Sequence, residues 1–182
     1  EIETGLPAGM SALAFNTRRP VFQDPRVRRG LLLLFNFEWV NKTLYHGLYK
    51  RTESFFERSY LSSAGKPADA RERELLAPFP DAVLPEVMEG RYRMSVSDGT
   101  GHNRENAREA FRLFSEAGYV IDGGRLVHKD TREPLGFEIL AGSSVQQRLI
   151  ASYVSDLAKL GIAARLRVVD SSQYQSRLKD YD

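Results

Sequence analysis

The stretch from residue 135 to residue 169 limits the fold more than any other, because a strand, a helix and a second strand follow one another in it. Residues 135–140 (LGFEIL) form a short apolar run, and a helix opened by Ser143 or Ser144 follows. Residues 162–169 then alternate between apolar and arginine side chains, as in a strand with one solvent-facing side. This connection is long enough for a right-handed crossover between parallel strands. We therefore predict an α/β fold in which helices pack on a mixed sheet.

The first part of the chain carries one strand and two helices by the same criteria. Met10–Phe15 (MSALAF) is a short apolar run between turn residues, which predicts a buried strand. Asp24 followed by Pro25 has the chemistry of a helix N-cap and first helical residue, and apolar side chains then recur at helical spacing. Asn36 can cap a second helix that ends near Gly47.

Further helix and turn boundaries can be read from single residues. Asn103 is a predicted N-cap, and Gly118 lies where the C-terminal cap of that helix belongs. An Asp-Gly pair at residues 122–123 predicts a turn between short strands. Asp170 or Ser171 is predicted to cap a last short helix.

Residues 50–102 differ from the rest, because proline and glycine interrupt the stretch repeatedly. One short charged helix is predicted near Ala68–Leu76. Aromatic residues recur throughout, so we expect an ordered segment rather than a disordered one. A long irregular segment inside a compact domain is usually functional or covers a neighbouring surface.

The overall composition excludes several classes of protein. The 182 residues fit one domain that is large enough to enclose a core, and the net charge of +2 gives no field that would attract nucleic acid. No apolar run is long enough for a membrane helix, so we expect no direct membrane insertion. Cysteine is absent, which excludes disulfides and thiolate metal sites.

No set of residues has a catalytic or metal-binding pattern. Glu53 with Glu57 and Glu105 with Glu109 lie four apart, but neighbouring arginines make them salt-bridged surface pairs. The histidines are scattered singly, without a second ligand at metal-binding spacing. No nucleophile elbow or phosphate loop is present. We therefore predict no enzyme, no metal and no cofactor.

A basic cluster beside the first predicted helix is the strongest candidate for a charged binding surface. It consists of Arg18, Arg19, Arg26, Arg28 and Arg29. Nucleic-acid binding would need stacking aromatics and a net basic domain as well. We predict a solvated face, with contacts to another part of a parent protein as the alternative.

The order of these elements resembles a known family. Residues 13–56 read LAFNTRRPVFQDPRVRRGLLLLFNFEWVNKTLYHGLYKRTESFF, and the second half contains NRENAREAFRLFSEAGYVIDGGRLV and LAKLGIAARLRVVDSSQYQSRLKDYD. Together they resemble the extracellular solute-binding proteins of ABC importers, in particular the oligopeptide/dipeptide-binding family. The runs RTESFF and SAGKPADARERELLAPF are similar to the branch that includes the microcin C and murein-peptide binders.

The resemblance implies a fold, a location and partners. Residues 1–182 would form a single α/β lobe of a periplasmic binding protein, with residues 50–102 as a long irregular insertion within it. The chain would be a fragment, and the missing second lobe of the same protein would complete a cleft that closes on its ligand. The implied ligand is an oligopeptide or modified peptide, and the implied protein partners are the permease subunits of an ABC transporter.

The candidate ligand-binding residues lie at the start of the irregular segment, where polar and aromatic side chains occur together. Arg51, Thr52, Ser54 and Phe56 offer a guanidinium, two hydroxyls and a ring, a mixture that suits peptide capture. We predict that at least one of them lines the cleft. In the alternative, Phe55 and Phe56 belong to the core and Arg51 pairs with a local glutamate.

Asn16 is a further candidate, because it follows the first predicted strand. In the family implied by the resemblance the chain crosses between lobes near such a position. Asn16 and Thr17 could therefore face the cleft or only fix the turn. The alternative for the whole chain is a stand-alone interaction module that grips a protein partner through residues 50–102.

Overall fold

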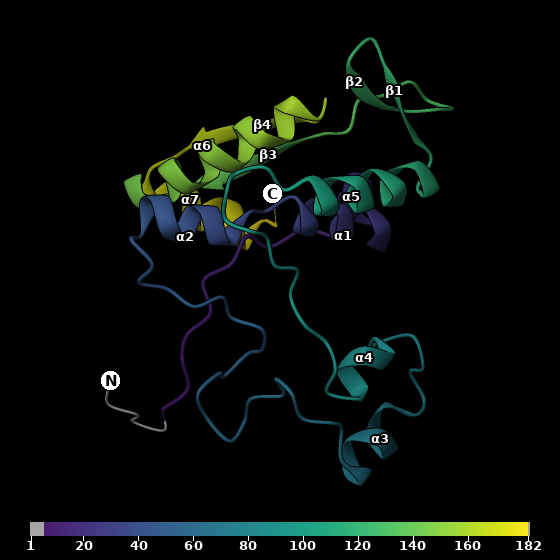
Figure 1. The fold of residues 1–182 in the computed structure, drawn as a ribbon, viewed down its shortest axis with the longest axis vertical. Helices are drawn as coiled ribbons and strands as arrows, with labels where there is room; N and C mark the ends of the chain where they lie inside the picture. Colours follow the sequence, from purple (N-terminus) through teal and green to yellow (C-terminus); the bar gives the residue numbers. More distant parts are fainter. Residues whose placement is uncertain (1–5, 182) are drawn as a thin grey trace. The chain divides into compact units, whose positions relative to one another are not determined.

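The computed structural model describes residues 6–181, and the chain in it divides into two compact units (Figure 1). The larger unit comprises Ala14–Leu48 and the chain from Val96 onward. The smaller unit comprises the chain up to Leu13 together with Tyr49–Ser95. The chain therefore leaves the larger unit after Leu48 and returns to it at Val96.

Most of the regular structure belongs to the larger unit. Its elements are a 3-10 helix η1 (Pro20–Phe22), α1 (Pro25–Leu33), α2 (Phe37–Leu44), α5 (Arg104–Glu116), β1 (Tyr119–Asp122), β2 (Arg125–His128), β3 (Gly136–Ala141), α6 (Ser144–Lys159), β4 (Ala163–Val168) and α7 (Ser171–Lys179). The smaller unit contains α3 (Ala70–Leu76), which confirms the predicted charged helix, and α4 (Pro85–Met88).

The strands form two small sheets. β3 and β4 pair in parallel from Gly136 opposite Ala163 to Ala141 opposite Val168, and α6 joins them and packs on them (Figure 1). This confirms the predicted strand–helix–strand unit. β1 and β2 form an antiparallel hairpin whose two-residue loop, residues 123–124, has positive φ at both glycines. The Asp-Gly turn prediction is therefore confirmed as well.

Side-chain caps fix the helix starts as predicted. The Asp24 side chain accepts from Arg26 N at 2.8 Å, and Asn36 accepts from Trp39 N at 3.2 Å. α6 and α7 follow the same pattern, with Ser143 as the cap of α6 and Asp170 as the cap of α7. Asp170 rather than Ser171 is thus the last cap.

Asn103 precedes α5, as predicted, but its side chain does not cap that helix. Its Nδ2 instead donates to the carbonyl oxygen of Leu33 at 3.0 Å. Leu33 lies in the last turn of α1, where carbonyl groups lack helical partners. The amide therefore ties the start of α5 to the end of α1.

The core of the larger unit lies where α1, α5 and α6 meet. Its buried residues are Phe22, Val27, Leu31, Leu34, Ala110, Phe114, Leu126, Leu135, Tyr153, Leu157 and Ile162. α1 can approach α5 closely because Gly30 has no side chain, and a methyl group there would lie 2.5 Å from Phe114 Cε1. The buried Tyr153 hydroxyl of α6 donates to the Leu31 carbonyl oxygen of α1 at 2.6 Å.

Two arginines of the basic cluster hold the backbone of their own unit. Arg28 Nη1 donates to the carbonyl oxygens of Phe22 and Gln23 at 2.6 and 2.8 Å. Arg26 Nη1 donates to the Glu116 carbonyl oxygen at 2.7 Å, at the end of α5. Arg26 remains exposed, as expected of a solvated face, whereas Arg28 is half-buried, and both contribute charge-assisted hydrogen bonds to the fold.

The predicted strand at Met10–Phe15 does not form. Met10 and Leu13 are exposed, and no strand among residues 6–181 pairs with this segment. A single extended segment leaves its N–H and C=O groups without partners, so apolar composition alone cannot make it a strand. Phe15, at its end, packs its ring 5.2 Å from that of Phe22.

We predict that Gly30→Ala destabilises the protein by about 1–3 kcal/mol, because the new methyl group must displace the buried Phe114 ring. Gly9→Ala is the matched control, since nothing lies within 4 Å of a methyl group built there. Urea unfolding of both variants measures the difference. Equal stabilities for the two variants would contradict the close approach of α1 and α5.

Asp24→Ala should cost about 1 kcal/mol of unfolding free energy at neutral pH through the lost cap. The side-chain hydrogen bond from Arg26 lowers the pKa of Asp24 below its usual range. Its ionised form is thus favoured by folding, and that contribution is present above the ordinary carboxyl pKa and is lost as the pH falls through the lowered one. The difference between wild type and variant should therefore shrink in acid, which unfolding curves over a pH series would test.

Candidate functional site

The segment that begins at Arg51 is held against the end of the smaller unit. Arg51 is half-buried, and its Nη1 donates to the Ser95 carbonyl oxygen at 2.6 Å. The next contact is from the backbone N–H of Met94 to Glu53 Oε1 at 3.2 Å. Thr52, between them, is half-buried. The guanidinium of Arg51 thus forms a hydrogen bond within the smaller unit.

Ser54 is a buried bridge. The residue is only 8% exposed, and its Oγ lies 2.9 Å from the Oγ of Ser63. The Ser63 backbone N–H also donates to Ser54 Oγ at 3.0 Å. A buried hydroxyl with two such partners fixes the ends of the intervening turn to each other, because leaving it unpaired would cost free energy.

The turn between these serines has an unusual backbone. Phe56 and Arg58 have φ values of +59° and +65°, which lie in the left-handed region that residues other than glycine seldom adopt. Side-chain hydrogen bonds hold it: Glu57 Oε1 accepts from the Glu53 N–H at 2.8 Å, and Ser59 Oγ donates to the Phe56 carbonyl oxygen at 2.7 Å. Such strain persists where the surroundings over-determine it and is common at functional sites.

Both rings of this turn point away from the interior of their unit. Phe55 is 68% exposed and Phe56 is 53% exposed, and their ring centroids lie 6.5 Å apart. The alternative in which these two side chains belong to the core is therefore wrong for this unit. Phe55, which was not among the predicted ligand-binding residues, is the more exposed of the two.

Asn16 belongs to the larger unit, whereas the other four candidates belong to the smaller one. Its Oδ1 accepts from the Arg18 N–H at 3.1 Å, and its Nδ2 donates to the Tyr181 carbonyl oxygen. The Arg18 guanidinium also lies 3.8 Å from the centroid of the Tyr181 ring. The structure therefore shows Asn16 fixing a turn and joining it to the far end of the larger unit.

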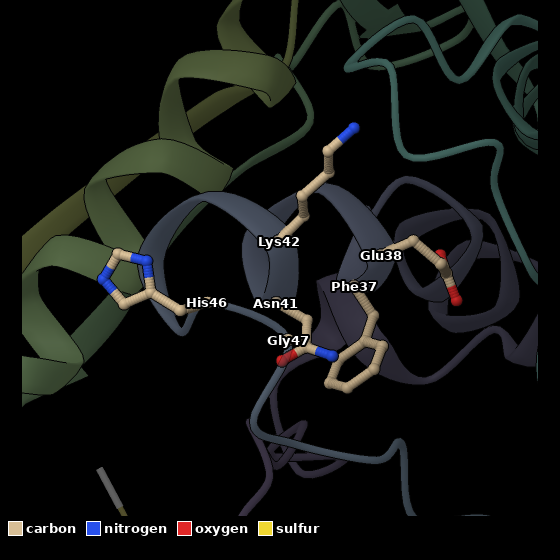
Figure 2. A pocket seen from close by; sticks show the side chains of 6 residues that line it. All are labelled: Phe37, Glu38, Asn41, Lys42, His46 and Gly47. Carbon is tan, nitrogen blue, oxygen red and sulfur yellow. The ribbon is translucent and has the colours of Figure 1, made fainter.

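A shallow depression of about 500 Å³ lies along α2. Figure 2 shows its side chains, which are Phe37, Glu38, Asn41, Lys42 and His46, with Gly47. Lys42 and Glu38 point away from each other, and His46 lies at the opposite end of the helix from Glu38. These polar groups do not converge on one point, so the depression lacks the focused arrangement of a small-molecule site.

The carboxylate of Glu38 is engaged by the returning chain. Ser97 donates to Glu38 Oε2 from its backbone N–H at 3.0 Å and from its Oγ at 2.9 Å. The same Oγ lies 2.5 Å from Oδ1 of the buried Asn36. Gly101 follows closely over Trp39. The chain is therefore anchored on the first turn of α2 directly after it re-enters the larger unit, an interaction that no sequence motif indicates.

A second depression, of about 400 Å³, lies beside β3, β4 and α7. Glu138 is its central charge, with Arg177 Nη1 at 2.9 Å and Arg167 Nη1 at 3.8 Å. All three side chains are partly solvent-exposed, so these ion pairs add little stability.

The described residues contain no group of three or more histidine, cysteine, aspartate or glutamate side chains that could hold a metal ion. Glu109, one of the paired carboxylates, accepts from Arg112, which lowers the pKa of Glu109. A general acid needs a raised pKa instead.

No helix within residues 6–181 is long and apolar enough to cross a membrane.

The family of bacterial extracellular solute-binding proteins, family 5 (middle region), matches residues 1–182, and the chain belongs to this family. A Brucella melitensis protein described only as a binding protein is 49% identical over 180 residues, which are 99% of this chain and 29% of that protein. The probable peptide-binding protein YejA of Agrobacterium fabrum is 43% identical, covering 95% of this chain and 28% of its own length. The peptidoglycan-binding protein YepA of the same organism is 39% identical, covering 97% and 29%.

A solved structure has the same fold. The oligopeptide-binding protein AppA from Bacillus subtilis, in complex with a nonapeptide, matches 91% of this chain and 27% of its own with a TM-score of 0.61 and 16% identity. The α/β fold is thereby confirmed, and the family match over residues 1–182 confirms the resemblance to the solute-binding proteins. The chain spans less than a third of the length of the relatives that it matches.

We predict that Ser97→Ala lowers the unfolding free energy by about 1–2 kcal/mol, because it removes the hydroxyl that lies between the buried Asn36 oxygen and the Glu38 carboxylate. Amide exchange in residues 96–101 should accelerate at the same time. Ser115→Ala, on the exposed face of α5, is the matched control and should change neither quantity. Unchanged exchange in the Ser97 variant would show that this hydroxyl does not anchor the chain.

Proposed function

We propose that this chain is one lobe of a periplasmic binding protein that captures peptides for an ABC importer. The observation that carries the proposal is the family match over residues 1–182. Relatives described as peptide-binding and peptidoglycan-binding support peptide-like ligands. The protein would act by binding and release, without catalysing a reaction.

The lobe would work together with a second lobe of the same protein. Because the chain covers only 28–29% of its relatives, most of each relative lies outside the matching region. We propose that the ligand is held in a cleft between the lobes and that hinge motion closes them around it. The isolated lobe would bind weakly, since it offers only half of the enclosure that buries a ligand. Release would occur at the permease subunits of the transporter.

The ligand class that we propose is an oligopeptide or a modified peptide. The relative described as a peptidoglycan-binding protein supports a murein peptide, and the RTESFF run supports the branch that also includes microcin C binders. We propose that at least one of Arg51, Thr52, Ser54 and Phe56 lines the cleft. Asn16 could contribute from the larger unit in addition to fixing its turn.

A stand-alone protein-interaction module is the second candidate. The exposed aromatic side chains of residues 50–102 favour it, because aromatic residues are enriched in protein interfaces. The family match argues for the binding protein, since it extends over both units instead of ending at the irregular segment.

Native mass spectrometry of the intact protein, purified from the periplasm with nothing added, tests the proposal. We expect a retained small mass that fragments as a peptide, because closure around a ligand slows its release. A co-purifying protein subunit would favour the interaction module instead. A retained mass without peptide bonds would contradict the proposed ligand class.

A further inference from the structure

We propose that Phe55 and Phe56 form an aromatic platform that contacts an apolar or aromatic side chain of the bound peptide. The polar residues around them would hold the platform in place instead of touching the ligand. This inference rests on the proposed function. It narrows the candidate site from a mixed polar and aromatic surface to two rings.

Four polar side chains of the segment, those of Arg51, Glu53, Ser54 and Glu57, already have partners within the smaller unit. Arg51 donates to the Ser95 carbonyl oxygen, and Ser54 pairs with Ser63. The carboxylates of Glu53 and Glu57 accept from the backbone N–H groups of Met94 and Glu53. A ligand would have to break these hydrogen bonds to reach the same groups, and leaving the buried Ser54 hydroxyl unpaired is costly. A ligand can contact the exposed rings of Phe55 and Phe56 without breaking any of these hydrogen bonds.

The backbone of the turn is held in the shape that displays the rings. Phe56 itself has a left-handed conformation, and so does Arg58 two residues later. The Glu57 carboxylate, the Ser59 hydroxyl and the buried Ser54 hydroxyl all stabilise this turn. Three independent side-chain hydrogen bonds around one strained turn fit a pre-formed binding surface, because pre-organisation lowers the entropy lost on binding.

The rings have a geometry that can accept an apolar group. Their planes are inclined at 51° with centroids 6.5 Å apart, so the faces are not stacked on each other and remain available. Aromatic faces prefer offset or edge-to-face contact with another ring and give large contact area at low entropic cost. A peptide with an aromatic side chain is the ligand that gains most from such a platform.

The test uses the full-length protein and two tripeptides, Ala-Phe-Ala and Ala-Ala-Ala, whose affinities are measured by calorimetry. We expect the wild type to prefer the phenylalanine peptide by about tenfold, and Phe55→Ala and Phe56→Ala each to reduce that preference several-fold. Phe79→Ala is the matched control, because Phe79 is 62% exposed and lies in the same unit. It should leave the preference unchanged.

Arg51→Ala separates a positioning role from direct contact. The Arg51 side chain would act through the Ser95 carbonyl that holds the segment, so its loss should reduce the preference for Ala-Phe-Ala and leave the affinity for Ala-Ala-Ala unchanged. Direct contact of Arg51 with the ligand would instead weaken both peptides by the same factor. Phe56→Leu keeps an apolar side chain on the turn if Phe56→Ala does not fold. A preference for Ala-Phe-Ala that survives in both Phe55→Ala and Phe56→Ala would overturn the platform. An equal loss of affinity for both peptides in these two variants would overturn it as well.

Binding of neither peptide by the wild-type protein would count against the peptide ligand, and carbene photolabelling then decides the platform separately. The probe is the small-molecule fraction released by heating the natively purified full-length protein. Protection of Phe55 and Phe56, but not of Phe79, when this fraction is added back would support the platform. Equal labelling with and without the fraction would overturn it, as would rings already shielded in the ligand-free protein.

Discussion

The packing of α1 on α5, joined to α6 by the hydrogen bond from Tyr153 to Leu31, forms a large part of the buried core of the larger unit. Gly30 permits the close approach to Phe114, and the Tyr153 hydroxyl supplies a partner for a carbonyl in the last part of α1. α6 then carries the parallel pair of β3 and β4, since it joins these strands and packs on them. The same α1 carries Arg26 and Arg28, whose hydrogen bonds fix the neighbouring backbone.

Features that depend on neighbouring residues could be predicted from the sequence. Asp24 and Asn36 cap their helices because an acceptor two or three residues before a free N–H needs no tertiary contact. The Asp-Gly turn is equally local. The crossover from β3 to β4 could be predicted because the periodicity of this stretch is long and clear. Asn103 shows the limit of this reasoning, because a carbonyl of another helix competes successfully for its side chain.

Features that depend on distant partners could not be predicted. Met10–Phe15 has the composition of a strand, but a strand requires a second backbone with free groups, and composition does not reveal one. The sequence places Arg51 and Ser54 in a segment of mixed polar and aromatic residues, but it does not reveal their hydrogen-bond partners Ser95 and Ser63. Hydrophobicity alone would bury Phe55 and Phe56, whereas the backbone conformation of the turn turns them outward.

A peptide binder that recognises mainly the ligand backbone gains affinity without much selection among side chains. An aromatic pair adds a modest preference, since ring contacts contribute about 0.5–1.5 kcal/mol beyond the area that they bury. That amount changes affinity several-fold and still admits peptides without an aromatic residue. The turn around Phe56 suits this purpose because its hydrogen bonds fix the rings before a ligand arrives. A rigid platform therefore biases the choice of ligand without making one side chain obligatory.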